Sequence, residues 1–319
     1  MGGESIVAVE HLTKVYRSRR RSEVRAVDDV SFDVAPGEIV GLLGPNGAGK
    51  TTTIKCLCTL VSPTSGRIVV DGVDAAKESR AATAKLAAVL EGNRNIYWRL
   101  TALENLEYFA ALHGVPRRSI AALSDELIDR FGLAEARNAD ARTLSRGMQQ
   151  KLAVACAFVK QTPILLLDEP TLGLDVETSL ELRGMLRSLA ADAGRTILLS
   201  SHDMDVVQDV CERVVIINNG RIVTADRIDN LLDLFRVRAY RFTVQGRVDE
   251  TALHQRFNGI GITTEGNTTL IEVEIVDGGV FYELVDTLRG SDAVIESIDR
   301  KDPDLEEVFL RIVRGEVYK

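Results

Sequence analysis

The segment Gly44-Pro-Asn-Gly-Ala-Gly-Lys50-Thr51-Thr52 is the most informative part of this sequence, because it fits the pattern G-x-x-x-x-G-K-[ST]. Glycines in such a loop let the backbone turn tightly and aim its N–H groups at phosphate oxygens. The lysine reaches the β- and γ-phosphates, and the hydroxyl that follows can ligate Mg²⁺. We therefore predict a nucleotide phosphate site formed by Gly44, Pro45, Asn46, Gly47, Ala48, Gly49, Lys50, Thr51 and Thr52.

The residues on either side of this loop support the prediction. The apolar run Glu38–Leu43 leads into the loop, and a helix is predicted over Thr51–Leu60. A helix that starts at the loop adds the positive end of its dipole to an anion site. A strand, a Gly-rich loop and a helix in this order are the context that the pattern requires.

Further short apolar runs indicate the class of the fold. Strands are predicted at Ile6–Val9, Val30–Val34, Ile164–Leu167, Thr196–Leu199 and Val214–Ile217. Short, fully apolar strands are typical of a parallel sheet that helices cover on both faces. The sequence therefore predicts an α/β domain over residues 1–234.

A helical subdomain is predicted inside that domain, over about residues 84–160. Helical patterns cover Thr101–Leu112, Ser119–Phe131 and Met148–Val159, and few strands interrupt them. The subdomain would lie between the phosphate loop and the strand Ile164–Leu167.

Residues 235–319 are predicted to form a separate α+β domain. The predicted strands are Ala239–Val244, Ile262–Thr264, Leu270–Val276 and Val294–Ile298, and the predicted helices are Glu250–Phe257, Val280–Leu288 and Asp304–Val313. The order β-α-β-β-α-β is that of the ferredoxin-like arrangement.

Charge and composition exclude some classes of function. The 319 residues carry a net charge of −8, and an acidic chain fits nucleic acid poorly because phosphate contacts need a basic surface. The one basic cluster, Arg17 to Arg25, is interpreted as a solvated hairpin tip or as a contact for anionic lipid or an acidic partner. No signal peptide and no apolar run long enough to span a bilayer is seen. Cys56, Cys58, Cys156 and Cys211 are expected to be buried free thiols, as in a reducing cytoplasm.

A second acidic motif completes the candidate catalytic site. The run Ile164-Leu-Leu-Leu ends at Asp168-Glu169. A buried strand would deliver Asp168 to the sheet edge, where its carboxylate can hold Mg²⁺. Glu169 would then polarise the attacking water as a general base.

Together these motifs resemble the nucleotide-binding subunit of ABC transporters. Leu144-Ser145-Arg146-Gly147-Met148 resembles the family's signature motif, which usually reads Leu-Ser-Gly-Gly-Gln. Gly173-Leu174-Asp175 resembles the D-loop, and His202 resembles the switch histidine. Tyr16 lies where the family places an aromatic ring that stacks on adenine.

The resemblance implies a dimer in which two copies meet head to tail around two ATP molecules. Ser145 and Gly147 of one copy would bind the γ-phosphate of the ATP held by the other. His202 would contact the γ-phosphate and hold the attacking water, and Asp175 would also belong to the ATP site. Arg146 replaces a glycine of the signature. Glu91 stands nearest to the missing Q-loop glutamine and is the expected third Mg²⁺ ligand, beside Thr51 and Asp168.

The resemblance also implies a separate transmembrane permease, which would hold the chain at the cytoplasmic face of the cell membrane. Tyr97 and Trp98, flanked by Arg94 and Arg99, suit an interface with that permease; a local core under the helical subdomain is the alternative.

The C-terminal segment Pro303-Asp-Leu-Glu-Glu-Val-Phe-Leu310 resembles the tail of exporter ATPases of the daunorubicin-resistance type. We therefore expect an ATPase that powers export of a drug-like, lipid-like or polysaccharide substrate. The alternatives are an importer ATPase, a soluble ABC ATPase acting on ribosomes or DNA, and a regulatory module without catalysis. The single phosphate loop, the acidic charge and the presence of Glu169 and His202 argue against the last two.

Overall fold

The computed structural model describes residues 5–17, 23–92, 95–234, 239–246, 248–257, 260–274, 278–289, 293–301 and 305–313. These residues divide into two compact units. The second unit is Asp229–Arg311, and the first is the described chain before it together with Ile312 and Val313. The division falls six residues before the predicted boundary at Leu234.

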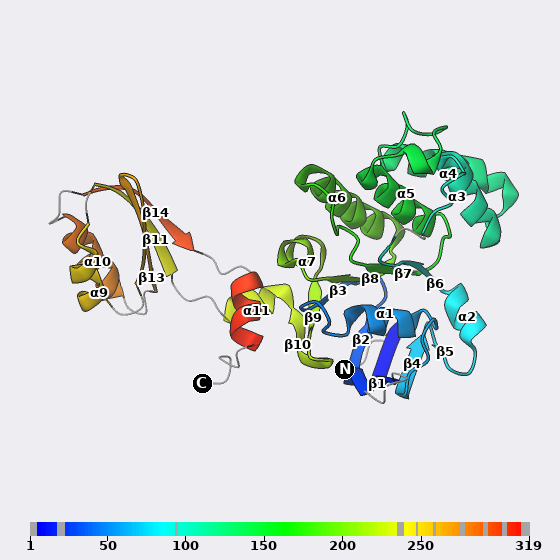
Figure 1. The fold of residues 1–319 in the computed structure, drawn as a ribbon, viewed down its shortest axis with the longest axis horizontal. Helices are drawn as coiled ribbons and strands as arrows, with labels where there is room; N and C mark the ends of the chain where they lie inside the picture. Colours follow the sequence, from blue (N-terminus) through cyan, green and yellow to red (C-terminus); the bar gives the residue numbers. More distant parts are fainter. Residues whose placement is uncertain are drawn as a thin grey trace. The chain divides into compact units, whose positions relative to one another are not determined.

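The first unit is built around a six-stranded sheet (Figure 1). Its order is β10-β9-β3-β8-β7-β6, and all neighbours are parallel except the edge pair β10 and β9. The strands are β3 (Ile39–Leu43), β6 (Leu86–Val89), β7 (Ile164–Asp168), β8 (Thr196–Ser201), β9 (Arg213–Asn218) and β10 (Arg221–Arg227). Every residue of β3, β7 and β8 is buried, as expected for strands that are covered on both faces.

A second, antiparallel sheet corrects part of the prediction. Its strands are β1 (Val7–Arg17), β2 (Glu23–Val34), β4 (Ser65–Val70) and β5 (Val73–Asp74), in the order β2-β1-β4-β5. The apolar runs at Ile6–Val9 and Val30–Val34 were expected in the parallel sheet, but they lie here. Burial alternates along the end of β2, with Phe32 buried and Asp33 exposed. A strand with one solvated face suits an antiparallel sheet.

Helix α1 (Lys50–Leu57) joins the two sheets, because it contacts β2 on one side and β7 and β8 on the other (Figure 1). It ends three residues before the predicted limit, Leu60. Ile54 and Leu57 belong to the core that all these strands share. Helices α2 (Ser79–Ala84) and α7 (Met204–Val210) also contact strands of the sheets, and α6 (Val176–Ala193) packs against α7.

The predicted helical segment is present, but it starts later than expected. Residues 86–89 form strand β6 of the main sheet, and the helices follow it. They are α3 (Ala102–Leu112), α4 (Arg117–Arg130) and α5 (Arg146–Phe158), with a 3₁₀ turn η1 (Ala141–Thr143) before α5. A capping box starts α3: Thr101 accepts from the N–H of Glu104, and Glu104 accepts from the N–H of Thr101.

The second unit contains a four-stranded antiparallel sheet in the order β12-β13-β11-β14. Its elements are β11 (Ala239–Gln245), α9 (Glu250–Arg256), β12 (Gly261–Glu265), β13 (Thr268–Glu274), α10 (Gly278–Arg289) and β14 (Val294–Lys301). Phe242, Ile271 and Leu284 lie in its core. Helix α8 (Ile228–Leu234) precedes these elements and α11 (Leu305–Val313) follows them.

Two further expectations concern the cysteines and segments that could span a membrane. The four cysteines are buried and free, and burial raises the pKa of Cys56 to about 11 and that of Cys58 to about 12. Among the described residues, no helix has the length and apolar character needed to cross a membrane.

Candidate functional site

Two positions of the Gly-rich loop between β3 and α1 have room only for glycine. A Cβ on Gly44 would lie 2.1 Å from the carbonyl oxygen of Ile217. Gly49 has a φ of 112°, and a Cβ there would lie 2.4 Å from the carbonyl oxygen of Ala26. The loop is thus fixed between β2 of the antiparallel sheet and β9 of the six-stranded sheet, with α1 starting at Lys50.

Lys50 is nearly buried at the floor of this loop, where its ammonium group has two kinds of partner. Its Nζ donates to the carbonyl of Gly44 at 2.7 Å and lies 3.3 Å from Oε1 of Glu169. Both side chains are at most 7% exposed. A buried lysine needs compensating negative charge, and the Glu169 carboxylate supplies it here.

Asp168 ends β7 beside the start of α1, where one carboxylate oxygen is paired and the other is not. Its Oδ1 accepts from the hydroxyls of Thr51 at 3.0 Å and Ser200 at 2.6 Å. Its Oδ2 is buried without a hydrogen-bond partner. A buried carboxylate oxygen left open beside a threonine hydroxyl fits Mg²⁺, which binds through one or two carboxylates and substrate phosphates.

Glu169 follows in a left-handed conformation, with a φ of 51°. Its N–H donates to the carbonyl and the hydroxyl of Ser200, each at 3.1 Å. These bonds turn its side chain out of the sheet, and its Oε2 lies 2.9 Å from Nδ1 of His202. A strained residue held by its surroundings at the end of a strand is typical of a functional site.

An open cleft of about 470 Å³ lies over the loop. The residues that line it come from five segments of the first unit: Ala26, Asn46, Gly47, Ala48, Gly49, Lys50, Thr51, Thr52, Glu91, Glu169, Leu172 and His202. Most of the predicted phosphate loop, both predicted catalytic residues and Glu91 are therefore gathered around one space. It is large enough for the phosphates of a nucleotide.

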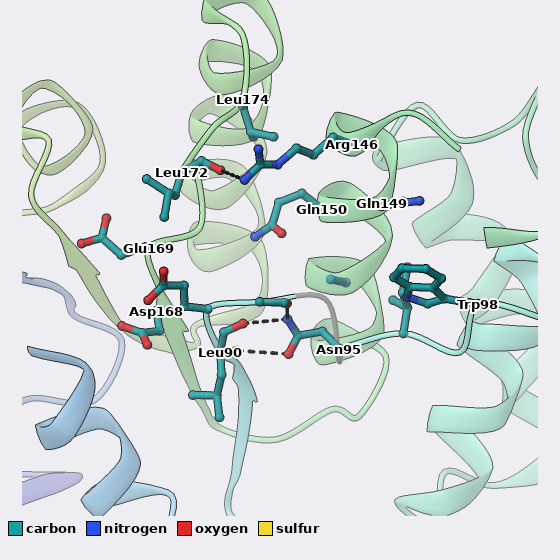
Figure 2. Close-up of a pocket in the computed structure, with 14 residues that line it drawn as sticks. Leu90, Asn95, Trp98, Arg146, Gln149, Gln150, Asp168, Glu169, Leu172 and Leu174 are labelled. Atoms are coloured by element: carbon teal, nitrogen blue, oxygen red, sulfur yellow. Dashed lines mark hydrogen bonds between the residues drawn. The ribbon is translucent and has the colours of Figure 1, made fainter. Parts of the chain in front are cut away.

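Glu91 lies on a turn that a single side chain braces. Asn95 accepts from the N–H of Leu90 at 3.1 Å and donates to the carbonyls of Leu90 and Gly92 (Figure 2). This bracing holds Glu91 at the cleft after β6 ends.

Some residues named in the predictions lie outside the described residues. They are Arg94, which was expected to flank Tyr97 and Trp98, Arg19–Arg21 of the basic cluster, and Pro303 of the C-terminal segment.

Other predicted ATP residues do not line the cleft of their own chain. Ser145 caps α5 through the N–H of Met148, and Gly147 packs on Thr178 of α6. Asp175 caps α6, because both its oxygens accept from Thr178, and these bonds lower the pKa of Asp175. Tyr16 is 40% exposed beside Lys14 on β1 and is not among the lining residues.

Two residues that support the site were not singled out from the sequence. Ser200 binds Asp168 with its hydroxyl and Glu169 with its hydroxyl and carbonyl, and Asn95 shapes the turn at Glu91. Ser200 was visible at the end of an apolar strand two residues before His202. Only the parallel register, which places Asp168 opposite Ser200, gives it a role.

Tyr97 and Trp98 are 49% and 46% exposed, which argues against a local core. The Tyr97 ring packs edge-on against Tyr108 at 4.7 Å, and their hydroxyls lie 3.2 Å apart. Leu112 on the same helix α3 is also exposed. Tyr97, Trp98 and Tyr108 are thus exposed aromatic side chains of this region, and Tyr97 and Tyr108 are in contact.

Comparison with known proteins agrees with this geometry. The family model described as ABC transporter matches residues 27–172. The chain is 38% identical to the ABC transporter ATP-binding protein NatA of Bacillus subtilis over 214 residues, which are 67% of this chain and 87% of NatA. It is 32% identical to the methionine import ATP-binding protein MetN of Streptomyces coelicolor over 300 residues, which are 89% of this chain and 85% of MetN.

A solved structure shares the fold of the first unit. A dimeric ATP-binding cassette in a post-hydrolysis state, bound to ADP and Pi, superposes with a TM-score of 0.63 at 26% identity. The match covers 70% of this chain and 98% of the cassette. By sequence, fold and site, the chain belongs to the ABC transporter family as one of its ATP-hydrolysing, ATP-binding subunits.

Proposed function

We propose that the cleft over the Gly-rich loop hydrolyses ATP with Glu169 as general base. The observation that supports this proposal is the placement of Glu169, buried between Lys50 and His202 at the edge of the cleft. Water attacks the γ-phosphorus in line with the bond to the β-phosphate oxygen, and that bond breaks to leave ADP and phosphate. Glu169 takes the proton of the water, and His202 holds the carboxylate in place.

Lys50 changes partner in this proposal. In the structure its ammonium group lies 3.3 Å from Oε1 of Glu169. The β- and γ-phosphates offer stronger, multiply charged acceptors at the same place. When Lys50 turns to them, the carboxylate of Glu169 is released toward the water. Thr51, Asp168 and Glu91 would hold Mg²⁺, which when bound neutralises charge on the phosphates.

The site is completed by a second copy of the chain. Ser145 and Gly147 stand at the N-terminus of α5, whose dipole suits a phosphate, yet they do not line their own cleft. A head-to-tail dimer would bring them, with Asp175, to the partner's ATP. The dimeric state of the similar cassette supports this arrangement.

The chain would power a separate transmembrane permease and bind it at the cytoplasmic face of the membrane. The exposed surface around Tyr97 and Trp98 is the proposed docking site, because exposed aromatic side chains are typical interface anchors. The second unit would have a ferredoxin-like fold, given its element order and antiparallel sheet.

Two directions of transport are proposed. Export of a drug-like, lipid-like or polysaccharide substrate follows from the resemblance of Pro303–Leu310 to exporter tails. Import is favoured by the 32% identity over 300 residues to a protein named for methionine import. The two are separated by isolating the permease with the tagged chain and measuring ATP-driven flux in inside-out vesicles, where export gives accumulation in the vesicle and import gives loss from it.

The test of the catalytic assignment is the substitution Glu169→Gln. We expect retained ATP binding, a stable dimer in ATP and hydrolysis reduced by at least about a hundredfold, in the usual range for a general base. Hydrolysis within about twofold of the unaltered chain would refute the role of Glu169. The exposed Glu135, changed to Gln, is the matched control and should leave turnover unchanged.

A further inference from the structure

Arg146 is not among the residues that line the cleft over the loop, but it lines a second pocket that shares Glu169 and Leu172 with that cleft (Figure 2). It is exposed at the first position of α5, and its guanidinium group lies over the turn that follows Glu169 (Figure 2). Its Nη2 donates to the carbonyl of Leu172 at 3.3 Å. A Cβ built on Gly173 would lie 2.6 Å from its Cζ, so the guanidinium group packs directly on the backbone of Gly173.

The turn held by Arg146 leads back to Glu169 in two bonds. The N–H of Leu172 donates to the carbonyl of Glu169 at 3.2 Å, and the carbonyl of Leu172 accepts from Arg146. Glu169 has a left-handed backbone, so its side-chain direction depends on the bonds that fix the turn. Leu172 also lines the cleft beside Glu169.

A second contact joins the same two segments. A Cβ on Gly147 would lie 2.7 Å from Cγ2 of Thr178, and Thr178 is held by both oxygens of Asp175. The start of α5 therefore packs on the start of α6 without a gap. A displacement of Ser145–Gly147 would be passed to the segment between Glu169 and Asp175 of the same chain.

We propose that Arg146 is a positioning residue that links the start of α5 to Glu169 within one chain. This inference rests on the proposed dimer, in which Ser145 and Gly147 contact the partner's ATP. Phosphate binding at the start of α5 would then set the turn at Leu172 and orient Glu169 for the chain's own ATP. Arg146 would make hydrolysis at one site depend on occupancy of the other.

The competing role for Arg146 is a direct contact with the partner's γ-phosphate. That role acts between chains, whereas the proposed one acts within a chain. The two therefore differ in which copy must carry Arg146, and dimers made of two different copies distinguish them. Copies with different affinity tags are mixed, purified on both tags in turn and assayed as full-length chains.

In the first mixed dimer, one copy carries Arg146→Ala and the other carries Glu169→Gln. The only intact Glu169 then lies in the copy that lacks Arg146. It faces the start of α5 of the other copy, which retains Arg146. We expect about a tenfold lower kcat than in a dimer of unaltered and Glu169→Gln copies, which corresponds to the loss of one hydrogen bond from a charged group. Activity equal to that reference would overturn the proposal.

In the second mixed dimer, one copy carries both substitutions and the other is unaltered. The intact Glu169 then belongs to the unaltered copy, which also has Arg146, so kcat should equal that of the reference dimer. If Arg146 instead contacted the partner's γ-phosphate, the tenfold loss would be seen in this second mixed dimer. In the first mixed dimer, Arg146→Lys in place of Arg146→Ala should restore part of the activity, because lysine can still donate to the Leu172 carbonyl. Arg142→Ala, at an exposed arginine paired with Asp140, is the control and should change nothing.

Failure of the inference and of the proposed function give different results. If the unaltered chain does not hydrolyse ATP, or if Glu169→Gln is as active as the unaltered chain, the proposed function fails. If both behave as expected and the first mixed dimer matches the reference, only the role of Arg146 fails. Equal thermal melting of the Arg146 and Arg142 variants shows that the difference does not come from folding.

Discussion

Nδ1 of His202 lies 2.9 Å from Oε2 of Glu169, although the two residues are 33 positions apart in the chain. The contact exists because β7 and β8 are parallel neighbours and end at the same edge of the sheet. On its other side, the Glu169 carboxylate faces Lys50 of the phosphate loop. The carboxylate of Glu169, the proposed general base, is therefore held between Lys50 and His202.

The first prediction concerns His202. We expect His202→Ala to lower kcat by about a hundredfold with little change in the dissociation constant for ATP, since the imidazole orients Glu169 and does not bind the loop. Hydrolysis is measured by phosphate release, and binding by fluorescence of an ATP analogue. His254→Ala, at a histidine of the second unit, is the control. A loss of ATP affinity that accounts for the whole loss of rate would contradict this assignment.

The second prediction concerns Ser200. Ser200→Ala removes the hydroxyl that donates to Oδ1 of Asp168 and accepts from the N–H of Glu169. Leaving these buried groups with one partner fewer should cost about 1–3 kcal/mol of folding free energy. We also expect a weaker response of the rate to Mg²⁺, because Asp168 would lose part of its fixed orientation. Urea unfolding and a Mg²⁺ titration of the rate measure the two effects, and an unchanged titration would refute the second.

The third prediction compares two glycines of the loop. Gly44→Ala places a Cβ 2.1 Å from a backbone oxygen that cannot move easily, so it should destabilise the fold by at least about 3 kcal/mol and abolish ATP binding. Gly47→Ala meets no atom within 4 Å, and only its φ of 81° opposes the substitution, at about 1 kcal/mol. Thermal melting and ATP binding of the two variants should differ accordingly. Equal melting temperatures would show that the close approach at Gly44 is relieved elsewhere.

The fourth prediction concerns the number of chains at each site. If Ser145 and Gly147 of a second copy complete the cleft, specific activity should rise with protein concentration as dimers form. It is measured by diluting the chain at saturating ATP over at least two orders of magnitude. A specific activity that stays constant down to a demonstrated monomer would exclude the composite site.

The fifth prediction is a pH dependence of stability. Desolvation raises the pKa of Glu38, but hydrogen bonds from Arg213 and from the N–H of Ala35 outweigh it, so the folded-state pKa is lowered. A carboxyl with a lowered folded-state pKa stabilises the fold above its unfolded pKa, and this stability is lost as pH falls through the folded value. Glu38→Gln should therefore lower the melting temperature at pH 7 and much less at pH 3.

The control for that measurement is an exposed carboxyl without such partners. Glu135→Gln should melt like the unaltered chain at both pH values. If Glu38→Gln and the unaltered chain differ by the same amount at pH 7 and pH 3, the pair of Glu38 with Arg213 does not carry the pH dependence.

The features that depend on neighbours along the chain could be predicted from the sequence. The Gly-rich loop between an apolar run and a helix predicted the phosphate site, and the run ending at Asp168 and Glu169 predicted the second acidic motif. The three helices between residues 101 and 159 followed from their periodicity. Each of these signals is local, because glycine conformation, helix start and strand burial act within a few residues.

Contacts between residues that are far apart in the chain could be identified only from the tertiary structure. The structure places Ile6–Val9 and Val30–Val34 in an antiparallel sheet and not in the predicted parallel one, because the choice between sheets depends on partners that are distant in the chain. It gave Ser200 its place opposite Asp168 and turned Arg146 onto Leu172, contacts that span 32 and 26 residues. Register between parallel strands and the packing of one helix start on another leave no local pattern in the sequence, because they depend on residues far apart in the chain.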